Sequence, residues 1–239
     1  MALPIDRRLP LALLPTPLEP ADRLGEELGM EPGALWVKRD DLTGLGGGGN
    51  KARKLEYLCA DAVGSGADTL VTGGGLQSNH VRMTAAVANR LGLACTVVLA
   101  GERPPTATGN VVLVELFGPE IVWAGLQGGP APRAGPVQMD YYAIEAAIDT
   151  TYDRLAAEGR MPYRIPIGGA SAVGALGYVR AATELADQAA SAFGPLELVV
   201  VADGSGGTHA GLAAGLGDQT LVLGIDVGAR PDLDTQVPA

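Results

Sequence analysis

The chain has 239 residues, of which 47% are hydrophobic and 18% are charged. This length and composition are typical of a globular protein that buries a sizeable core, and they exclude a disordered chain. Seventeen basic residues against 27 acidic ones give a net charge of −10, and aromatic residues make up only 4%. Both figures argue against nucleic acid or an anionic membrane as a partner.

The two cysteines and two histidines limit the covalent and metal chemistry of the chain. Cys59 and Cys95 lie in apolar stretches, which is typical of buried thiols in a reducing compartment such as the cytoplasm. Neither histidine stands at zinc-ligand spacing, so we expect no metal. Prolines interrupt the N-terminal apolar run and no segment approaches the length of a membrane span, so we expect neither a secretory signal nor a membrane partner.

Strand and helix patterns alternate along the chain. A proline-rich arm precedes a short helix at 22–29 and a strand at 35–38, and apolar residues at helical spacing predict a helix over 52–63. The remaining pattern predicts strands at 69–72, 95–99, 120–123, 163–167, 196–202 and 221–227, and helices ending at 91, over 110–117, 141–158 and 173–193, and from about 209. Strands separated by helices predict parallel pairing with helices on both faces of the sheet.

Two segments have further meaning for the fold. The strand at 196–202 is nearly all apolar, which predicts a place at the centre of a parallel sheet. A loop at 125–136 is rich in glycine and proline, and it is the clearest boundary between units of the chain.

The chain is organised around a glycine-rich loop, in which four consecutive glycines precede Asn50, Lys51 and the start of a helix. Glycine lets a ligand approach the backbone, and a helix start offers free N–H groups to an anion such as a cofactor phosphate. Lys51 stands beside two other cations, Arg53 and Lys54. These neighbours favour the neutral amine that reacts with an aldehyde.

Other interpretations of this loop remain open. Residues 44–49 also fit the G-x-G-x-x-G pattern of dinucleotide-binding proteins, but this pattern alone is weak and no acidic residue stands at the expected distance. A phosphate loop is excluded because no Gly-Lys-Ser/Thr follows the glycines. A surface hinge before a solvated basic helix is the purely structural alternative.

Two further polar, glycine-rich turns follow predicted strands, at 73–80 and 204–208. Such turns gather at the carboxyl ends of parallel strands, so all three turns could line one cavity. Glycines together with the hydroxyls of Ser205 and Thr208 make the turn at 204–208 the best phosphate cradle in the chain. A plain turn with Thr208 as helix N-cap is the structural alternative.

The turn at 73–80 places Ser78, Asn79 and His80 where a helix begins. Hydroxyl, amide and backbone N–H groups together suit a small carboxylate. The structural alternative is Ser78 as an ordinary helix cap, with Asn79 and His80 solvated. A Ser-His-Asp hydrolase is the competing chemistry. It is disfavoured because Ser78 lacks the G-x-S-x-G context and because residues i and i+2 diverge on a helix.

Five stretches, taken in order, carry a resemblance to a known family: VKRDDLTGLGGGGNKARKLEYL, GGGLQSNHVRMTAA, LGLACTVVLAG, IPIGGASAVGALGYVRAATEL and VVADGSGGTHAGLAAGL. From about residue 14 to residue 228 the chain resembles the D-cysteine desulfhydrase and 1-aminocyclopropane-1-carboxylate (ACC) deaminase family. Its members are pyridoxal-phosphate enzymes with the tryptophan-synthase β-type fold. The resemblance implies a two-domain α/β structure of fold type II with parallel-sheet, three-layer αβα domains. Residues 1–47 plus 160–239 would form the larger, cofactor-binding domain and residues 48–159 the smaller one.

The resemblance also implies a role for each polar turn. Lys51 would hold pyridoxal phosphate covalently, and Asn79 would contact its pyridine hydroxyl. Lys51 and Ser78 are the expected catalytic residues, and Ser78, Asn79 and His80 are expected to receive the substrate carboxylate. The further cofactor-binding residues are expected to be Asn50, Lys54 and the phosphate-holding turn of Gly204, Ser205, Gly206, Gly207 and Thr208.

The implied function is β-elimination from a small amino acid of the D-cysteine type, which yields pyruvate and ammonia, in a cytoplasmic homodimer. The Ser-Asn-His form of the second turn is similar to the desulfhydrase branch, because the deaminase branch tends to carry glutamine at position 80. ACC deaminase activity and a non-catalytic role in binding pyridoxal phosphate or an amino acid are the alternatives.

One departure from the family pattern concerns the C-terminal region. Family members continue well beyond the strand at 221–227, into helices and a segment resembling Asp-Pro-Val-Tyr that supplies an active-site tyrosine and the partner of the pyridine nitrogen. The sequence reaches Ala239 without this segment, and no tyrosine here has a matching context. We therefore expect a C-terminally short fold: a fragment of a longer product, a shortened homologue, or a site that a partner chain completes.

Overall fold

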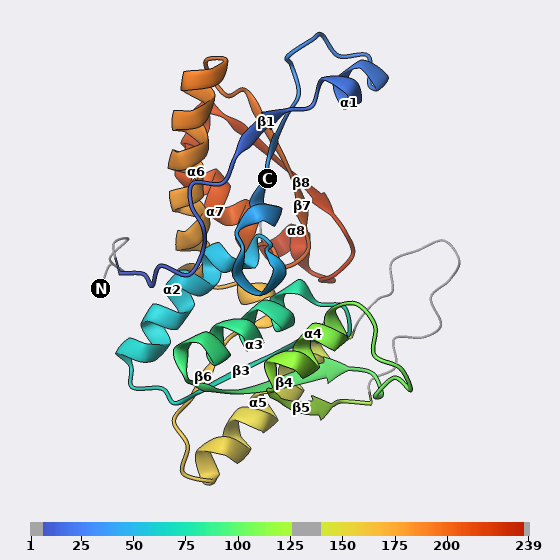
Figure 1. Ribbon diagram of the computed structural model, residues 1–239, viewed down its shortest axis with the longest axis vertical. Coiled ribbons are helices and arrows are strands. Elements are labelled where there is room, and N and C mark those ends of the chain that lie inside the picture. The colour runs from blue at the N-terminus through green and yellow to red at the C-terminus, as the bar shows by residue number, and fades with distance from the viewer. Residues whose placement is uncertain (1–6, 126–139, 237–239) are drawn as a thin grey trace.

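The computed structural model describes residues 7–125 and 140–236, which form an α/β structure in two parts (Figure 1). The strands are β1 (Leu18–Pro20), β2 (Trp36–Lys38), β3 (Thr69–Gly75), β4 (Ala94–Ala100), β5 (Glu120–Trp123), β6 (Pro162–Arg164), β7 (Leu198–Asp203) and β8 (Leu221–Asp226). The helices are α1 (Asp22–Glu27), α2 (Lys51–Gly64), α3 (Asn79–Leu91), α4 (Asn110–Phe117), α5 (Tyr141–Ala157), α6 (Ala172–Ala192), α7 (Gly207–Leu216) and α8 (Leu233–Gln236). The predicted loop at 125–136 lies, apart from Gly125, outside the described residues.

One part of the molecule is a parallel sheet with the strand order β5-β4-β3-β6. Successive side chains of a strand point to opposite faces, and both faces are covered. Val71 and Val98 pack against Ile144 and Ile148 of α5, whereas alternate residues of β4 pack against α3 and α4. Helices therefore lie on both faces of this sheet (Figure 1), as the alternating pattern predicts.

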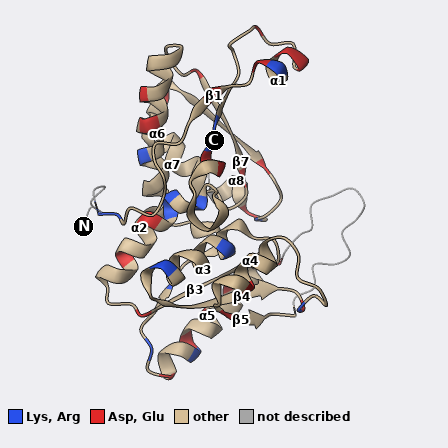
Figure 2. Ribbon diagram, in the orientation of Figure 1, with Lys and Arg blue, Asp and Glu red and all other residues tan. Residues whose placement is uncertain are grey.

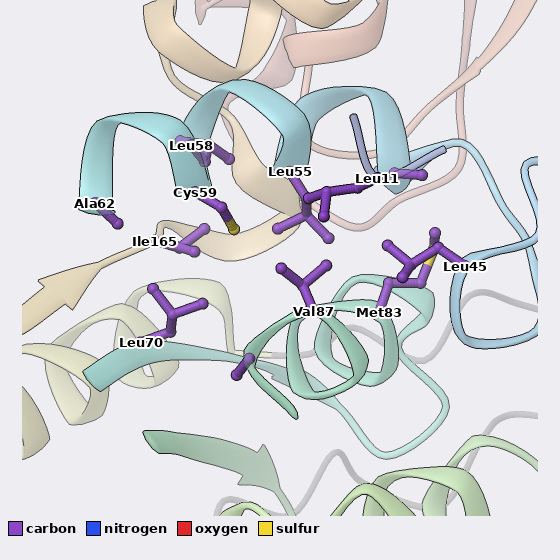
Figure 3. Close-up of a cluster of buried hydrophobic side chains, with 12 residues drawn as sticks. Leu11, Leu45, Leu55, Leu58, Cys59, Ala62, Leu70, Met83, Val87 and Ile165 are labelled. Carbon is purple, nitrogen blue, oxygen red and sulfur yellow. The ribbon is translucent and has the colours of Figure 1, made fainter. Parts of the chain in front are cut away.

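A buried cluster joins α2 to α3 and to the sheet (Figure 3). Leu55, Leu58 and Cys59 of α2 belong to this cluster, and Leu55 and Cys59 point towards Val87 of α3 and Ile165 after β6. Their spacing is the i, i+3, i+4 pattern of an amphipathic helix. The cluster fixes the position of α2, whose first residue is Lys51.

The second part contains the parallel pair β7–β8, with α6 and α7 packed on one face. Its other face is open: Leu198 and Val200 are 47% and 59% exposed, and alternate residues of β8 are exposed as well. The prediction of a central strand at 196–202 is therefore wrong for the described chain, in which β7 has β8 as its partner. An apolar strand is suited to burial on both faces, but its composition does not determine how many neighbours it has.

Two further predictions about strands are corrected. The first strand of the parallel sheet does not end at Thr72 but continues through three glycines to Gly75, because these pair in register with Val98–Ala100 of β4. In the proline-rich arm, β1 pairs antiparallel with β2, so pairing is not parallel throughout. Pro20 is tolerated in β1 because β1 is an edge strand. The predicted helices over 52–63, 110–117, 141–158 and 173–193 match α2, α4, α5 and α6 to within one residue at each end.

The division into two domains at residues 47, 48, 159 and 160 stays a prediction. The structure adds that β6, beyond residue 159, pairs with β3 and so extends the sheet of the smaller unit. Within the described ranges, every helix is too short or too polar to traverse a lipid bilayer.

Charged residues of both signs lie along α2 and α6 (Figure 2), and an ionic network joins the two helices. Arg53 of α2 is 1% exposed and donates hydrogen bonds to both carboxylate oxygens of Asp40 and of Glu184, at 2.8–3.0 Å. Lys38 of β2 donates to Glu184, and Tyr178 of α6 donates to Asp40 at 2.7 Å. Bidentate pairs of this kind set the geometry as well as the energy of a contact.

Where α2 crosses α6, Gly177 leaves no room for a side chain. A Cβ atom at this position would lie 2.3 Å from the carbonyl oxygen of Arg53 and 2.9 Å from the amide nitrogen of Lys54. We expect Gly177→Ala to lower the free energy of unfolding by about 1–3 kcal/mol, because the backbone of α2 has to move. Chemical denaturation followed by circular dichroism measures this loss. Gly25→Ala is the matched control: its Cβ would meet only ordinary contacts, at 3.6 Å and beyond, so an equal loss in the control would contradict the argument.

Candidate active site

A cavity of about 950 Å³ opens at the carboxyl ends of β3 and β4 and extends to the end of β7. All three polar turns contribute to its wall: the first through Lys51, the second through Gly74–His80, and the third through Gly204 and Ser205. Residues 100–102, 167–168 and 227–229 complete the lining. The structure thus brings together turns that lie far apart in the sequence.

Lys51 is the first residue of α2 and lines this cavity. Its amine lies 3.1 Å from the Asn50 amide oxygen. Burial lowers the pKa of Lys51 to about 8, and the negative charge of Asp203 opposes this shift. The expected cause, the neighbouring cations, is therefore incorrect: Arg53 turns away into its network with Asp40 and Glu184, and loss of hydration favours the neutral amine.

The glycine-rich loop before Lys51 contains one position, residue 48, at which only glycine fits. Gly48 has φ of 79°, and a Cβ atom there would lie 2.0 Å from the carbonyl oxygen of Asp41. Buried Thr43 closes the loop, because its hydroxyl donates to the Gly49 carbonyl at 2.8 Å and accepts from the Gly49 amide at 2.9 Å. These contacts fix the direction in which the backbone enters α2 at Lys51.

The turn at 204–208 leads into α7, whose N-cap is Gly206 without a side-chain cap. Thr208 lies inside the helix, so the alternative in which it caps α7 is wrong. Its hydroxyl contacts the Asn50 amide nitrogen at 3.5 Å. The first N–H groups of α7 have no partner within the helix, and this makes the turn suitable for an anion.

Lys54 lies directly beneath this turn. It is fully buried, its amine donates to the Gly168 carbonyl at 3.2 Å, and it lies 2.9 Å from where a Cβ of Gly207 would be. Burial lowers the pKa of Lys54 well below its ordinary value, and the positive charge of Lys51 adds to the effect. An anion bound at the turn would place a negative charge beside this amine and would favour its protonated form.

Asp203, at the end of β7, braces the same turn from the other side. One carboxylate oxygen accepts the Gly206 amide at 2.9 Å, and the other lies 2.8 Å from Nδ1 of His209 on α7. The other ring nitrogen, Nε2, lies 3.2 Å from the Val222 carbonyl, so both nitrogens of this ring face acceptors. Sequence reasoning did not single out either residue, although both flank the G-S-G-G-T motif.

Ser78 is the N-cap of α3, and its hydroxyl oxygen accepts the Val81 amide at 3.2 Å. The structural alternative is thus correct for Ser78 as a helix cap but wrong for His80, which is 2% exposed and therefore not solvated. The Ser78 hydroxyl hydrogen remains available to a ligand in the cavity. The backbone N–H groups of Asn79 and His80 open the helix and face no helical carbonyl. Hydroxyl and amide donors therefore converge at this helix start.

The His80 ring has a geometry that its sequence position does not suggest. Its Nε2 lies 3.0 Å from the Thr72 hydroxyl, which donates its hydrogen to the Ile165 carbonyl at 2.9 Å. The ring must therefore donate from Nε2, which leaves Nδ1 as a buried acceptor without a partner among the described residues. Burial lowers the pKa of His80 well below its ordinary value, and the charges of Lys51 and Lys54 lower it further. A neutral ring with this tautomer has no N–H for a carboxylate, so only the backbone N–H of His80 could serve that role.

Comparison with known protein families identifies one model, described as pyridoxal-phosphate dependent enzyme, which matches residues 9–237. The chain is 48% identical over 214 residues to D-cysteine desulfhydrase from Salmonella choleraesuis (strain SC-B67), and 47% identical to the enzyme of that name from Salmonella paratyphi C (strain RKS4594). Both alignments cover 87% of this chain and 60% of the relative. The chain thus spans about three fifths of the length of these curated relatives.

Solved structures give the same result for the fold. A crystal structure of an ACC deaminase homologue superposes with a TM-score of 0.81 and 38% identity, covering 97% of this chain and 67% of the other. A crystal structure of threonine deaminase from T.th. superposes with a TM-score of 0.62 at 24% identity, covering 88% of this chain and 59% of the other, a likeness that extends to the fold alone. These neighbours confirm the expected α/β architecture of fold type II.

Proposed function

The chain belongs to the family of pyridoxal-phosphate dependent enzymes, and from this membership we propose that it is a lyase that releases pyruvate, ammonia and hydrogen sulfide from D-cysteine and water. The observation that carries the proposal is a partly buried lysine with a pKa of about 8, which lines the same cavity as a glycine-rich turn suited to an anion and a helix start with hydrogen-bond donors for a carboxylate. The relatives named D-cysteine desulfhydrase support the choice of substrate.

The residues present fit the cofactor. The turn at 204–208 offers free N–H groups at a helix start. Lys54 lies beneath it, and its amine has no anionic hydrogen-bond partner among the described residues. A side chain at Gly168 would collide with the Ser205 hydroxyl, 2.4 Å from its Cβ position, so glycine keeps this wall open. Gly204, Ser205, Gly206, Gly207 and Thr208, with Lys54 and Asn50, would hold the phosphate end of pyridoxal phosphate.

Bound pyridoxal phosphate supplies an aldehyde for amines and a ring that withdraws electrons from Cα while a β-substituent leaves. Lys51, as a neutral amine, would hold this group covalently and, once displaced by substrate, would take the proton from Cα. Asn79 would donate its amide hydrogen to the pyridine hydroxyl oxygen. Ser78, with the backbone N–H groups of Asn79 and His80, would bind the substrate carboxylate and orient Cα towards Lys51.

The test is product analysis with purified protein and added pyridoxal phosphate. Pyruvate and sulfide from D-cysteine, with little from L-cysteine, are the expected products. Release of 2-oxobutanoate from ACC would instead identify the deaminase activity, which the ACC deaminase homologue at 38% identity supports as the second candidate. A bound cofactor without product would identify a non-catalytic binding protein, and absence of bound cofactor would overturn the proposal.

A cytoplasmic homodimer is part of the same proposal. Cys59 and Cys95 are free thiols, as expected in a reducing compartment. The dimer is implied by the resemblance, and light scattering of the purified protein would test it.

A further inference from the structure

Arg82 lies one turn after Asn79 on α3 and is 5% exposed. Its guanidinium donates to three neutral oxygens: the carbonyls of Gly46 and Gly48, the latter at 2.8 Å, and Oδ1 of Asn79 at 3.2 Å. Its Nε is buried and has no partner among the described residues. Burying a guanidinium among neutral acceptors alone destabilises the folded state. Because no ion pair offsets this cost among the described residues, the buried position of Arg82 needs another explanation.

The contact with Arg82 determines which way the Asn79 amide points. A guanidinium can only donate, so the Asn79 atom that faces it must be the oxygen Oδ1. Asn110, the first residue of α4, donates to the same oxygen from Nδ2 at 2.9 Å. With Oδ1 occupied by two donors, Nδ2 remains as the donor of a side chain that lines the cavity.

We propose that Arg82 is a positioning residue that acts through Asn79: it fixes the amide with Oδ1 turned inward and Nδ2 facing the ligand. Its positive charge polarises the Asn79 amide, which strengthens donation to a ligand oxygen that carries negative charge. The same guanidinium holds the glycine-rich loop at Gly46 and Gly48, so it joins the loop before Lys51 to the start of α3. This inference rests on the proposed function, because the ligand oxygen is the pyridine hydroxyl of pyridoxal phosphate.

The test is a double-mutant cycle read out as the dissociation constant of pyridoxal phosphate. Arg82→Lys keeps the charge but cannot reach three acceptors, and we expect it to weaken binding by roughly ten- to a hundred-fold, the value of a charge-assisted hydrogen bond. In an Asn79→Ala background the same substitution should weaken binding only about two- to three-fold, since its partner is gone. Equal losses in both backgrounds, or no loss in either, would overturn the proposal.

A second readout reports on the contact rather than on affinity. The visible absorption band of the bound cofactor depends on the hydrogen bond to its pyridine oxygen, so Arg82→Lys and Asn79→Ala should shift this band in the same direction. Arg90→Lys is the matched control on α3: its guanidinium donates to the Leu11 carbonyl at 3.1 Å, away from the cavity, and should change neither readout.

A third variant covers the case in which Arg82→Lys fails to fold. Asn110→Ala removes the other donor to Oδ1 of Asn79 from a partly exposed position, and we expect about three-fold weaker binding, absent in the Asn79→Ala background. An unchanged dissociation constant would overturn the assigned orientation of Asn79. Failure of the wild-type protein to bind pyridoxal phosphate is a separate result, which would remove the proposed function.

Discussion

Replacing Lys51 with alanine is expected to abolish covalent capture of pyridoxal phosphate and to lower release of pyruvate from D-cysteine by roughly 10³-fold or more, because the residue supplies both the attachment and the base. Reduction with borohydride followed by peptide mass spectrometry measures capture and identifies the modified lysine. Lys51→Arg is the companion variant, since it keeps a positive charge at this position but cannot attack an aldehyde.

Peptide mapping is essential because a second lysine, Lys54, lies one turn after Lys51 on α2. The pKa of Lys54 is also lowered, by burial and by the charge of Lys51. We expect it to remain unmodified because it lies beneath the turn, donating to the Gly168 carbonyl, whereas Lys51 lines the cavity. Modification of Lys54 in the wild-type protein would move the assignment to that residue.

The pH dependence of capture distinguishes a lysine with a lowered pKa from an ordinary one. Only the neutral amine attacks an aldehyde, and burial lowers the pKa of Lys51 to about 8. The rate of capture should therefore rise as the pH passes through about 8 and level off above it. An exposed lysine would continue to gain up to its ordinary pKa of 10.5. Stopped-flow absorbance across this range makes the measurement, and a midpoint near the ordinary value would contradict the burial argument.

The sequence predicted this part of the site because the relevant signals are local. Four glycines before Asn50 and Lys51, and a second glycine group from Gly204 to Gly207, are visible in the sequence itself. Parallel strands gather such turns at one edge of a sheet. This rule of topology explains why all three turns line one cavity, and why they lie around Lys51.

Contacts between distant residues could not be predicted in this way. His80 was expected to bind a carboxylate, but its tautomer depends on Thr72 in β3 and on the carbonyl of Ile165. Likewise Arg53 was expected to act on Lys51, but its partner Glu184 lies 131 positions away. Arg82 stands within the second motif, yet its role depends on how the glycine-rich loop lies against α3.

Removal of Glu184 is expected to have the largest effect on stability. Glu184→Ala should lower the free energy of unfolding by about 3–5 kcal/mol, because Arg53 is 1% exposed and would lose one of its two carboxylates. Lys38 would lose its carboxylate partner at the same time. Urea denaturation at neutral pH measures the loss. Glu158→Ala is the control: this carboxylate pairs with Arg154 on the exposed face of α5, and its removal should cost about 0–1 kcal/mol.

The difference between wild type and Glu184→Ala should itself depend on pH. Burial opposes ionisation of Glu184, but hydrogen bonds from Arg53 and Lys38 outweigh it and lower its pKa from 4.5 to about 2. A carboxylate whose pKa is lower in the folded state stabilises that state above its ordinary pKa, and this stabilisation is lost as the pH falls towards the lowered value. The two unfolding free energies should therefore converge between about pH 4.5 and about pH 2. A constant difference over this window would mean that Glu184 acts through packing rather than through charge.

The same variant tests whether the network also serves the site. Arg53 lies two residues after Lys51, and its pairs with Asp40 and Glu184 fix the first turn of α2 against α6. If this attachment orients Lys51, Glu184→Ala should slow capture of pyridoxal phosphate under conditions where the variant is still folded, with the midpoint of the pH profile unchanged because Asp203 and the surrounding cavity remain. A variant that is less stable but captures at the wild-type rate would restrict the network to holding the two helices together.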